Sequence, residues 1–167
     1  GQWLNLMKQK NHSSDVSPTG SQMPRLVGLA YASKIYRKLN IKKSNYFTND
    51  GNEIAWGTIG NASTSEGMFY EAINAAGVLQ IPMITSIWDD EYGISVSNEL
   101  QTTKSSISEV LSGFERTTDK KGFEILSVNG WDYPSLVKIY SKAEKLARIN
   151  HIPVIIHVKE LTQPLGH

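Results

Sequence analysis

The chain has 167 residues, of which 40% are hydrophobic and 20% charged, and its formal net charge is +1. This composition is typical of one globular domain with a buried core. The small net charge argues against binding to nucleic acid or to an anionic membrane. The apolar runs are too short to cross a bilayer, and the sequence shows no signal-peptide pattern. The absence of cysteine excludes disulfides, thiolate metal sites and cysteine nucleophiles, and it fits a cytoplasmic protein.

The N-terminal part of the chain divides into an arm and the start of a domain. Residues 1–23 show no period, and Ser17-Pro18-Thr19-Gly20 is a turn signal, so we expect an irregular arm or loop. Pro24 suits the first turn of a helix, because its missing N–H has no helical partner there. We therefore expect the domain to occupy residues 24–167. Its abrupt end after a long apolar strand suggests a domain excised from a larger protein.

Strand and helix patterns alternate from residue 54 onward. Asn49-Asp50-Gly51-Asn52 is a turn signal, compatible with a hairpin. Ser63 and Glu66 have the spacing of a capping box, which predicts a helix start. Further helices are predicted over 107–114 and from Pro134, and strands over 54–59, 83–88, 123–128 and 153–158. The alternation predicts an α/β fold, with a parallel sheet, right-handed crossovers and helices on both faces in three layers.

Two polar segments follow neighbouring strands of this expected sheet. The first is Gly60-Asn61-Ala62, and the second is Asp89-Asp90-Glu91-Tyr92-Gly93. Parallel strands end at one edge of the sheet, where open α/β sheets bind ligands. Asn61, Asp90 and the backbone carbonyl of Tyr92 offer the oxygen ligands that Mg²⁺ shares with phosphate and water. Amide groups of Ala62 and Ser63, at a helix start, would meet the phosphates. The alternative is that these residues only form turns.

The segment from Gly60 to Ser95 resembles the thiamine-diphosphate motif of the 2-oxo acid dehydrogenase decarboxylating components. That motif is Gly-Asp-Gly or Gly-Glu-Gly followed at a distance by Asn-Asn. The resemblance covers nearly the whole chain. It is carried by Ser17-Pro18, Gln22-x-Pro24-x-x-Val27-Gly28-x-Ala30, Glu66-Gly67, Glu71-Ala72, Asn74-Ala75-Ala76, Pro82, Tyr92-Gly93-Ile94-Ser95, Val128-Asn129-Gly130-x-Asp132 and Pro153-Val154-Ile155-Ile156.

The resemblance implies a thiamine-diphosphate-binding fold, with a magnesium and diphosphate site at the two polar segments. Asn61 stands where the family has an acidic ligand, and Asp90 where it has the second Asn of the pair, so one amide and one carboxylate are kept. Trp88 stands where some relatives carry a phosphate-pairing Arg. Asp89 adds a second acid, which would repel the diphosphate if it pointed inward.

Further roles follow from the same resemblance. Ser17, Thr19 and Gln22 align with a loop that touches the thiazolium-aminopyrimidine region or a nearby potassium ion (K⁺). His167 aligns with a histidine that faces the diphosphate and substrate, which makes it the candidate catalytic residue. Gly60 and Ile94, together with Ala62 and Ser63, complete the cofactor-binding set. The remaining histidines have no evident partner in the sequence, and His157, inside an apolar strand, is expected to be structural.

The resemblance also implies a function shared with other chains. The family carries out oxidative decarboxylation of a 2-oxo acid and transfers the acyl group to a lipoyl-bearing acyltransferase. A partner domain, like the β subunit, supplies the glutamate that activates the cofactor, so this chain is expected to be inactive alone and to work in a homo- or hetero-oligomer. Two alternatives stay open: a non-catalytic assembly domain of the same fold, and a transketolase-like thiamine enzyme. Branched-chain and pyruvate substrates are both compatible, with Ser17-Pro18 and Gln22 favouring the branched-chain type.

Overall fold

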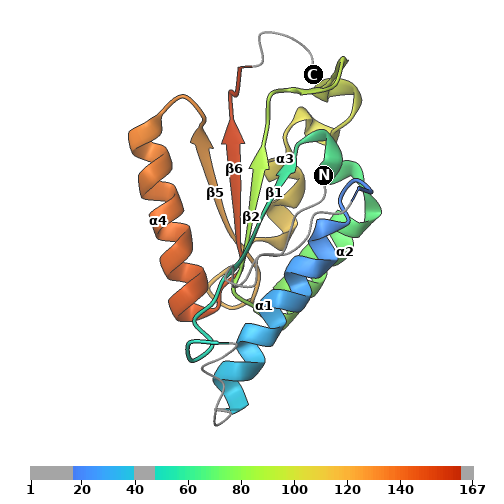
Figure 1. The fold of residues 1–167 in the computed structure, drawn as a ribbon. Helices are drawn as coiled ribbons and strands as arrows, with labels where there is room; N and C mark the ends of the chain where they lie inside the picture. Colours follow the sequence, from blue (N-terminus) through green and yellow to red (C-terminus); the bar gives the residue numbers. More distant parts are fainter. Residues whose placement is uncertain (1–16, 40–47, 163–167) are drawn as a thin grey trace.

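A four-stranded parallel sheet forms the centre of the molecule (Figure 1). The computed structural model describes residues 17–39 and 48–162. The strand order is β1-β2-β6-β5, with the bounds Ala55–Gly60, Met83–Trp88, Val154–Lys159 and Glu124–Asn129 respectively. The predicted sheet is confirmed: β2 coincides with its predicted range, and each of the other three strands lies one residue further along the chain.

Helices cover both faces of the sheet, which confirms the three-layer architecture. They are α1 (Gln22–Leu39), α2 (Gly67–Leu79), α3 (Ile107–Val110, continued by a 3₁₀ turn at Leu111–Phe114) and α4 (Tyr133–Asn150). Figure 1 shows α4 on one side of the strands and α1 and α2 on the other. One buried cluster joins α1, α2 and α3 to residues such as Ile59 and Ile87 of the sheet. A second cluster joins α4 to residues such as Ile84 and Ile156.

The strand order explains why α2 and α4 lie on opposite faces. The connection from β1 to β2 moves one way across the sheet, and the connection from β5 to β6 moves back toward the centre. Parallel crossovers are almost always right-handed, so a reversal of direction transfers the connecting helix to the other face. All four strands are parallel, with Gly60 opposite Trp88 and Asn129 opposite Lys159, so their carboxyl ends meet at one edge.

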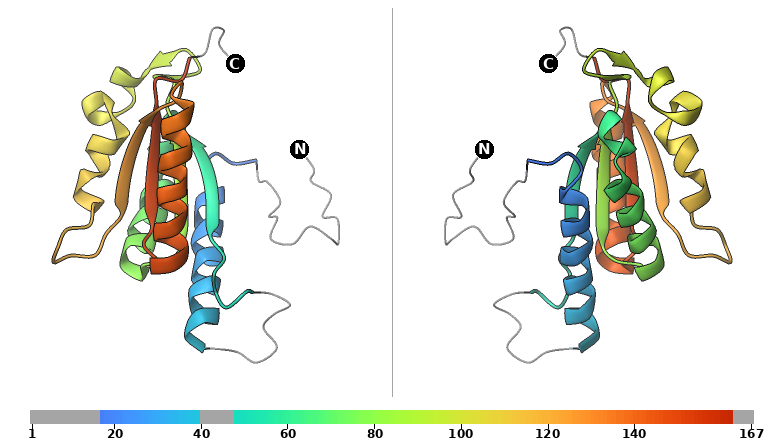
Figure 2. Two further views of the ribbon diagram at one scale, coloured as in Figure 1. Left: turned by 90° about the vertical axis from the view of Figure 1, so that its left-hand side faces the viewer. Right: turned by 90° about the vertical axis from the view of Figure 1, so that its right-hand side faces the viewer.

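Close contact with β1 fixes the start of α1 near that edge (Figure 2). A Cβ on Gly57 would lie 2.1 Å from Cδ1 of Leu26, so the glycine permits the helix to approach the strand. Gln22, near the beginning of α1, donates a hydrogen bond from Nε2 to the Thr58 carbonyl at 3.2 Å. These contacts hold the preceding turn, which includes Thr19, beside the end of β1.

The helix start after β1 differs from its prediction. Ala62–Ser65 form a 3₁₀ turn, and α2 begins only at Gly67. Glu66 is the N-cap of α2 but makes no side-chain capping bond, and its amide donates to the Ser63 carbonyl at 3.3 Å. The predicted capping box is therefore wrong. A 3₁₀ turn and a capping box both relate residues three positions apart, so the spacing alone does not distinguish them.

The polar loop after β2 contains more regular structure than expected. Tyr92–Gly93 (β3) and Val96–Ser97 (β4) form a short antiparallel hairpin, followed by 3₁₀ turns at Asn98–Leu100 and Thr103–Ser105. Four of its residues, Glu91 (φ 69°), Ile94 (φ 57°), Lys104 (φ 63°) and Ser105 (φ 52°), adopt left-handed backbone conformations. The loop therefore folds back on itself at the carboxyl edge of the sheet.

The turns that flank α1 agree only in part with their predictions. Ser21 donates from its amide to the Pro18 carbonyl at 3.2 Å, which confirms the first turn, although α1 begins at Gln22, two residues earlier than Pro24. The Asn49–Asn52 turn is closed by a 3.1 Å backbone hydrogen bond, but the hairpin proposed for it involves residues outside the described part. The domain boundary at residue 24 stays a prediction. Among the described helices, none has the length and apolar character needed to cross a bilayer.

Acidification should destabilise the protein through His151, the residue after α4. Burial of its imidazole lowers the pKa of His151, despite a 3.1 Å hydrogen bond to the Gly51 carbonyl, and the positive charges of Arg37 and Lys34 lower it further. An unfolded histidine titrates near pH ~6.5. As the pH falls below that value the unfolded chain takes up the proton first, so the free energy of unfolding should decrease until the pH is below the folded pKa.

Urea unfolding between about pH 7.5 and pH 5 tests this dependence. His151→Asn is the matched variant, because Asn tolerates the left-handed backbone at this position (φ 54°) but does not titrate. Its unfolding free energy should change less steeply with pH over this interval. An unchanged slope in the variant would show that another group is responsible.

Candidate cofactor-binding site

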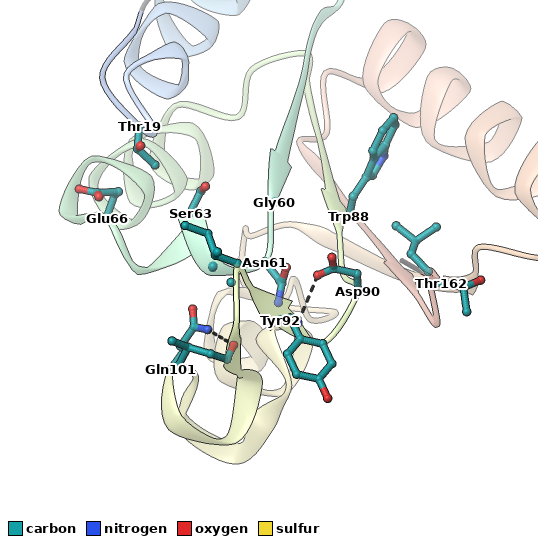
Figure 3. A pocket seen from close by; sticks show the side chains of 15 residues that line it. Thr19, Gly60, Asn61, Ser63, Glu66, Trp88, Asp90, Tyr92, Gln101 and Thr162 are labelled. Atoms are coloured by element: carbon teal, nitrogen blue, oxygen red, sulfur yellow. Dashed lines mark hydrogen bonds between the residues drawn. The ribbon is translucent and has the colours of Figure 1, made fainter. Parts of the chain in front are cut away.

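A pocket of about 780 Å³ opens at the carboxyl edge of β1 and β2 (Figure 3). This volume lies within the range of about 300–1,000 Å³ typical of small-molecule sites. Eight of the predicted site residues line it: Thr19, Gly60, Asn61, Ala62, Ser63, Asp90, Tyr92 and Ile94. Ser17 is exposed and does not line the pocket, and His167 lies outside the described residues. The structure thus brings together most of the set that the sequence indicated.

The first side of the pocket is the turn after β1. The amide of Asn61 donates to the Trp88 carbonyl at 3.0 Å, which continues the pairing of β1 with β2. The Asn61 side chain is almost fully buried, and its Nδ2 donates to Oδ1 of Asn98 at 3.3 Å. With the amide nitrogen used in this way, Oδ1 is the atom that Asn61 offers to a ligand. The 3₁₀ turn then places Ala62 and Ser63 along the pocket wall.

The second side is the turn after β2, where two adjacent acids have different surroundings. Asp90 lines the pocket, and its Oδ1 accepts a hydrogen bond from the Tyr92 amide at 3.2 Å. Asp89 is 5% exposed; its Oδ2 lies 2.8 Å from Nε2 of His157, and its Oδ1 accepts the Glu91 amide at 2.8 Å. Asp89 does not line the pocket. The repulsion expected from an inward-pointing Asp89 therefore does not arise in this arrangement.

Buried hydrogen bonds keep Asp89 ionised. Burial by itself would raise the pKa of Asp89, but the hydrogen bonds from His157, the Glu91 amide and Asn98, together with the electrostatic interaction with His157, lower it overall. His157 also contacts Ser108, with 2.9 Å between Nδ1 and Oγ. His157 is structural, as predicted, but it does have partners, contrary to the expectation from the sequence.

Negative and neutral groups dominate the pocket. Glu66 and Asp90 are both lining residues, and none of the described lining residues is Lys, Arg or His. Trp88, at the position of the family's Arg, donates its indole N–H to Ser86 at 3.0 Å and presents an exposed ring. Among the described lining residues, no positively charged side chain would offset the charge of a diphosphate bound here.

The described residues contain no group of three or more His, Cys, Asp or Glu side chains that would hold a metal alone. The donors that the sequence predicts are the Asn61 amide oxygen, the Asp90 carboxylate and the Tyr92 carbonyl, and all three residues line the pocket. Magnesium commonly combines one or two carboxylates with substrate phosphates and water. This donor set fits a metal that is shared with the diphosphate of a bound cofactor.

Sequence reasoning missed several residues at or behind the pocket. Four of them line the pocket: Glu66, Gln101, Leu161 and Thr162. The sequence predicts a capping-box role for Glu66, and the other three belong to no recognisable motif. Asn98 lies in a polar loop, and no sequence pattern identifies it as a site residue, yet it is buried against Asn61. The only hint was the length of that loop, since long ordered loops are often functional.

A methyl group at Gly93 should widen the gap between the two turns. Its Cβ would lie 2.5 Å from Cβ of Ala62 and 2.5 Å from Oε1 of Gln101, and the Cβ of Ala62 is fixed to the backbone. We expect Gly93→Ala to cost about 1–3 kcal/mol in the free energy of unfolding and to weaken ligand binding in the pocket. Gly67→Ala is the control, because nothing lies within 4 Å of its Cβ. Denaturant titration measures both variants, and equal losses for the two would contradict the steric argument.

Known structures share this fold. A transketolase from Pichia stipitis superposes with a TM-score of 0.64 at 22% identity, covering 84% of this chain and 19% of the transketolase chain. One from Campylobacter jejuni gives a TM-score of 0.62 at 24% identity, covering 85% of this chain and 20% of that chain. The chain therefore has the α/β fold of the thiamine-diphosphate-binding proteins.

Sequence comparison places the chain within that class. The family described as dehydrogenase E1 component matches residues 4–160, so the chain belongs to this family. Its α-subunit-like character follows from its relatives. The pyruvate dehydrogenase E1 component subunit alpha of Rickettsia bellii is 27% identical over 140 residues, which are 84% of this chain and 37% of that protein. The 2-oxoisovalerate dehydrogenase subunit alpha of Bacillus subtilis is 28% identical over 140 residues, 84% of this chain and 36% of that protein. The chain thus spans little more than a third of these relatives.

Proposed function

We propose that this chain is the magnesium- and diphosphate-binding half of the active site of a 2-oxo acid dehydrogenase. The observation that carries the proposal is a pocket lined by both turns, Gly60–Ser63 after β1 and residues 90–94 in the loop after β2. Membership of the E1 family supports the dehydrogenase reaction over the transketolase-like alternative. The full reaction is oxidative decarboxylation followed by acyl transfer to a lipoyl-bearing acyltransferase.

The residues of the pocket would divide the binding between them. Asn61 Oδ1, the Asp90 carboxylate and the Tyr92 carbonyl would hold Mg²⁺, and the amides of Ala62 and Ser63 would contact the phosphates. Ile94 and Trp88 offer exposed apolar surface at the rim of the pocket. Thiamine diphosphate, when bound, supplies the carbon nucleophile and electron sink that decarboxylation requires. The proposal also includes a K⁺ ion bound near the turn that contains Thr19, as the family resemblance implies.

The other half of the site would come from a partner. The described lining residues include two acids, Asp90 and Glu66. Asp90 is a proposed metal ligand, and the family resemblance implies that the glutamate that activates the cofactor comes from the partner domain. A β-subunit-like domain would supply that glutamate and close the pocket. The chain alone would then bind the cofactor weakly and not turn over substrate. Relatives named for pyruvate and for 2-oxoisovalerate leave both substrate classes open.

Calorimetric titration of the protein with thiamine diphosphate, with Mg²⁺ and with EDTA, tests the proposal. We expect binding only with the metal, and decarboxylation of a 2-oxo acid only when a β-subunit-like partner is added. Absence of binding even with that partner would favour the non-catalytic assembly domain. Asn61, Trp88 and Asp89 depart from the family pattern, and these departures favour that alternative. The burial of Asp89 beside His157 removes one of the three reasons for it.

A further inference from the structure

Asn98 lies behind the pocket, between the two turns that form it. It is 5% exposed, and its backbone amide donates to the Glu91 carbonyl at 2.8 Å. Its own carbonyl accepts the amides of Gln101 and Thr102 at 3.1 and 2.8 Å. The backbone of Asn98 is therefore held by the loop after β2, while its side chain reaches the turn after β1.

The carboxylate of Asp89 determines how the Asn98 amide is turned. An ionised carboxylate only accepts hydrogen bonds, so the group that faces it must be a donor. Nδ2 of Asn98 accordingly lies 3.4 Å from both carboxylate oxygens of Asp89. The same nitrogen lies 3.5 Å from the Ser105 carbonyl, which is also only an acceptor. Asn98 Oδ1 must then point the other way.

That orientation determines in turn how Asn61 is placed. Asn98 Oδ1 accepts hydrogen bonds from Asn61 Nδ2 at 3.3 Å and from the Thr102 hydroxyl at 3.0 Å. Because Asn61 uses its nitrogen toward Asn98, its one oxygen is left for the pocket. A carboxylate at residue 61 would present an oxygen in either orientation, whereas an amide presents one only if it is turned correctly.

We infer that Asn98 is a positioning residue that fixes the Asn61 amide with Oδ1 toward the metal, under the control of the Asp89 carboxylate. The inference rests on the proposed function, because it concerns the metal that the pocket would share with the diphosphate. It gives Asn98 and Asp89 a role at the site without contact with the cofactor. It also explains how an amide serves at a ligand position where the family has an acid.

The test compares Asn98→Ala with Ser108→Ala in the whole chain. Both variants lose hydrogen bonds of the same buried cluster, but only the first loses the bond to Asn61. The dissociation constant of thiamine diphosphate is measured by calorimetry with Mg²⁺ and, separately, with Ca²⁺. Mg²⁺ demands a near-octahedral ligand set and Ca²⁺ tolerates irregular ones. Asn98→Ala should therefore weaken Mg²⁺-supported binding about 10-fold and Ca²⁺-supported binding less. Ser108→Ala should leave the ratio of the two constants unchanged.

A second pair of variants makes the test specific to amide orientation. In an Asn61→Asp background the orientation no longer matters, so Asn98→Ala should cost much less than it does beside the native Asn61. A purely structural role would give equal losses in both backgrounds. If Asn98→Ala does not fold, Asn98→Ser replaces it, since serine removes the amide but keeps a small polar side chain at this position.

The outcomes separate the two proposals. If the native protein fails to bind thiamine diphosphate with either metal, both with and without a β-subunit-like partner, the proposed function fails and the inference fails with it. If the native protein binds with Mg²⁺, but Asn98→Ala keeps both its affinity and its Mg²⁺ to Ca²⁺ ratio, the inference alone is wrong. A loss that follows only the fall in thermal stability, as in Ser108→Ala, also overturns it.

Discussion

Replacing Asp90 with Asn should weaken Mg²⁺-dependent binding of thiamine diphosphate by about 100-fold, which is about 2.7 kcal/mol. Asp90 supplies the only carboxylate of the proposed ligand set, so its loss should weaken metal binding. The described pocket lining contains no Lys, Arg or His that would neutralise the diphosphate in place of the metal. The introduced amide keeps an oxygen for the 3.2 Å hydrogen bond from the Tyr92 amide, so the turn is preserved. Calorimetry at fixed Mg²⁺ measures the effect, and the melting temperature without ligand should hardly change.

Glu66, the second acid of the pocket, provides a control, because its substitution should not weaken cofactor binding as that of Asp90 does. Glu66 also lines the pocket but caps α2 without a side-chain hydrogen bond to its amides, so removing its charge disturbs little of the fold. Because a negative charge there repels the diphosphate, Glu66→Gln should leave binding unchanged or strengthen it. Equal weakening by Asp90→Asn and Glu66→Gln would mean that the cation is held by general negative charge. That result would exclude Asp90 as a specific ligand.

Periodicity and turn chemistry predict the architecture of this chain because each depends on nearby residues. The β2 strand at Met83–Trp88 was predicted without error, since Pro82 precedes it and polar residues follow it. The start of α2 was predicted wrongly, because the spacing of Ser63 and Glu66 fits either a capping box or the observed 3₁₀ turn. Local patterns thus identify the elements more reliably than they locate helix ends.

The two polar turns that line the pocket are predictable from the sequence, whereas the residues that support them are not. Asn61 and Asp90 follow adjacent parallel strands, and this topology is sufficient to bring them to one edge. The contact of Asp89 with His157 joins residues 68 positions apart in the sequence. This contact depends on which of the two neighbouring acids, Asp89 or Asp90, points into the protein interior. The local sequence does not determine that choice. Asn98 was missed for the same reason, since its role depends on the orientation of partners in two other segments.

Replacing His157 with Leu should cost about 3 kcal/mol in the free energy of unfolding, the largest stability loss that we expect from one substitution here. Asp89 and His157 are 5% and 1% exposed, and their side chains lie 2.8 Å apart. Without the imidazole, the Asp89 carboxylate keeps the Glu91 amide and Asn98 but loses the 2.8 Å contact of Oδ2 with His157 Nε2 while it stays buried. Urea unfolding gives the loss, and Ser108→Ala, which removes the contacts of Ser108 Oγ with His157 Nδ1 and with Ser106 Oγ but leaves the imidazole beside Asp89, should cost about 1 kcal/mol.

The double variant Asp89→Asn/His157→Leu decides whether the loss arises from an uncompensated charge or from poor packing. Removing both ionisable groups leaves a neutral amide where the carboxylate was, so the double variant should be more stable than His157→Leu alone. Mg²⁺-dependent cofactor binding, in contrast, should be weaker in the double variant than in His157→Leu, which keeps the Asp89 carboxylate. The neutral amide introduced at position 89 can donate as well as accept, so it no longer dictates the orientation of Asn98 and, through it, of Asn61. A gain in stability accompanied by weaker Mg²⁺-dependent binding would separate the two roles of Asp89, in folding and in setting the direction of the amides behind the pocket.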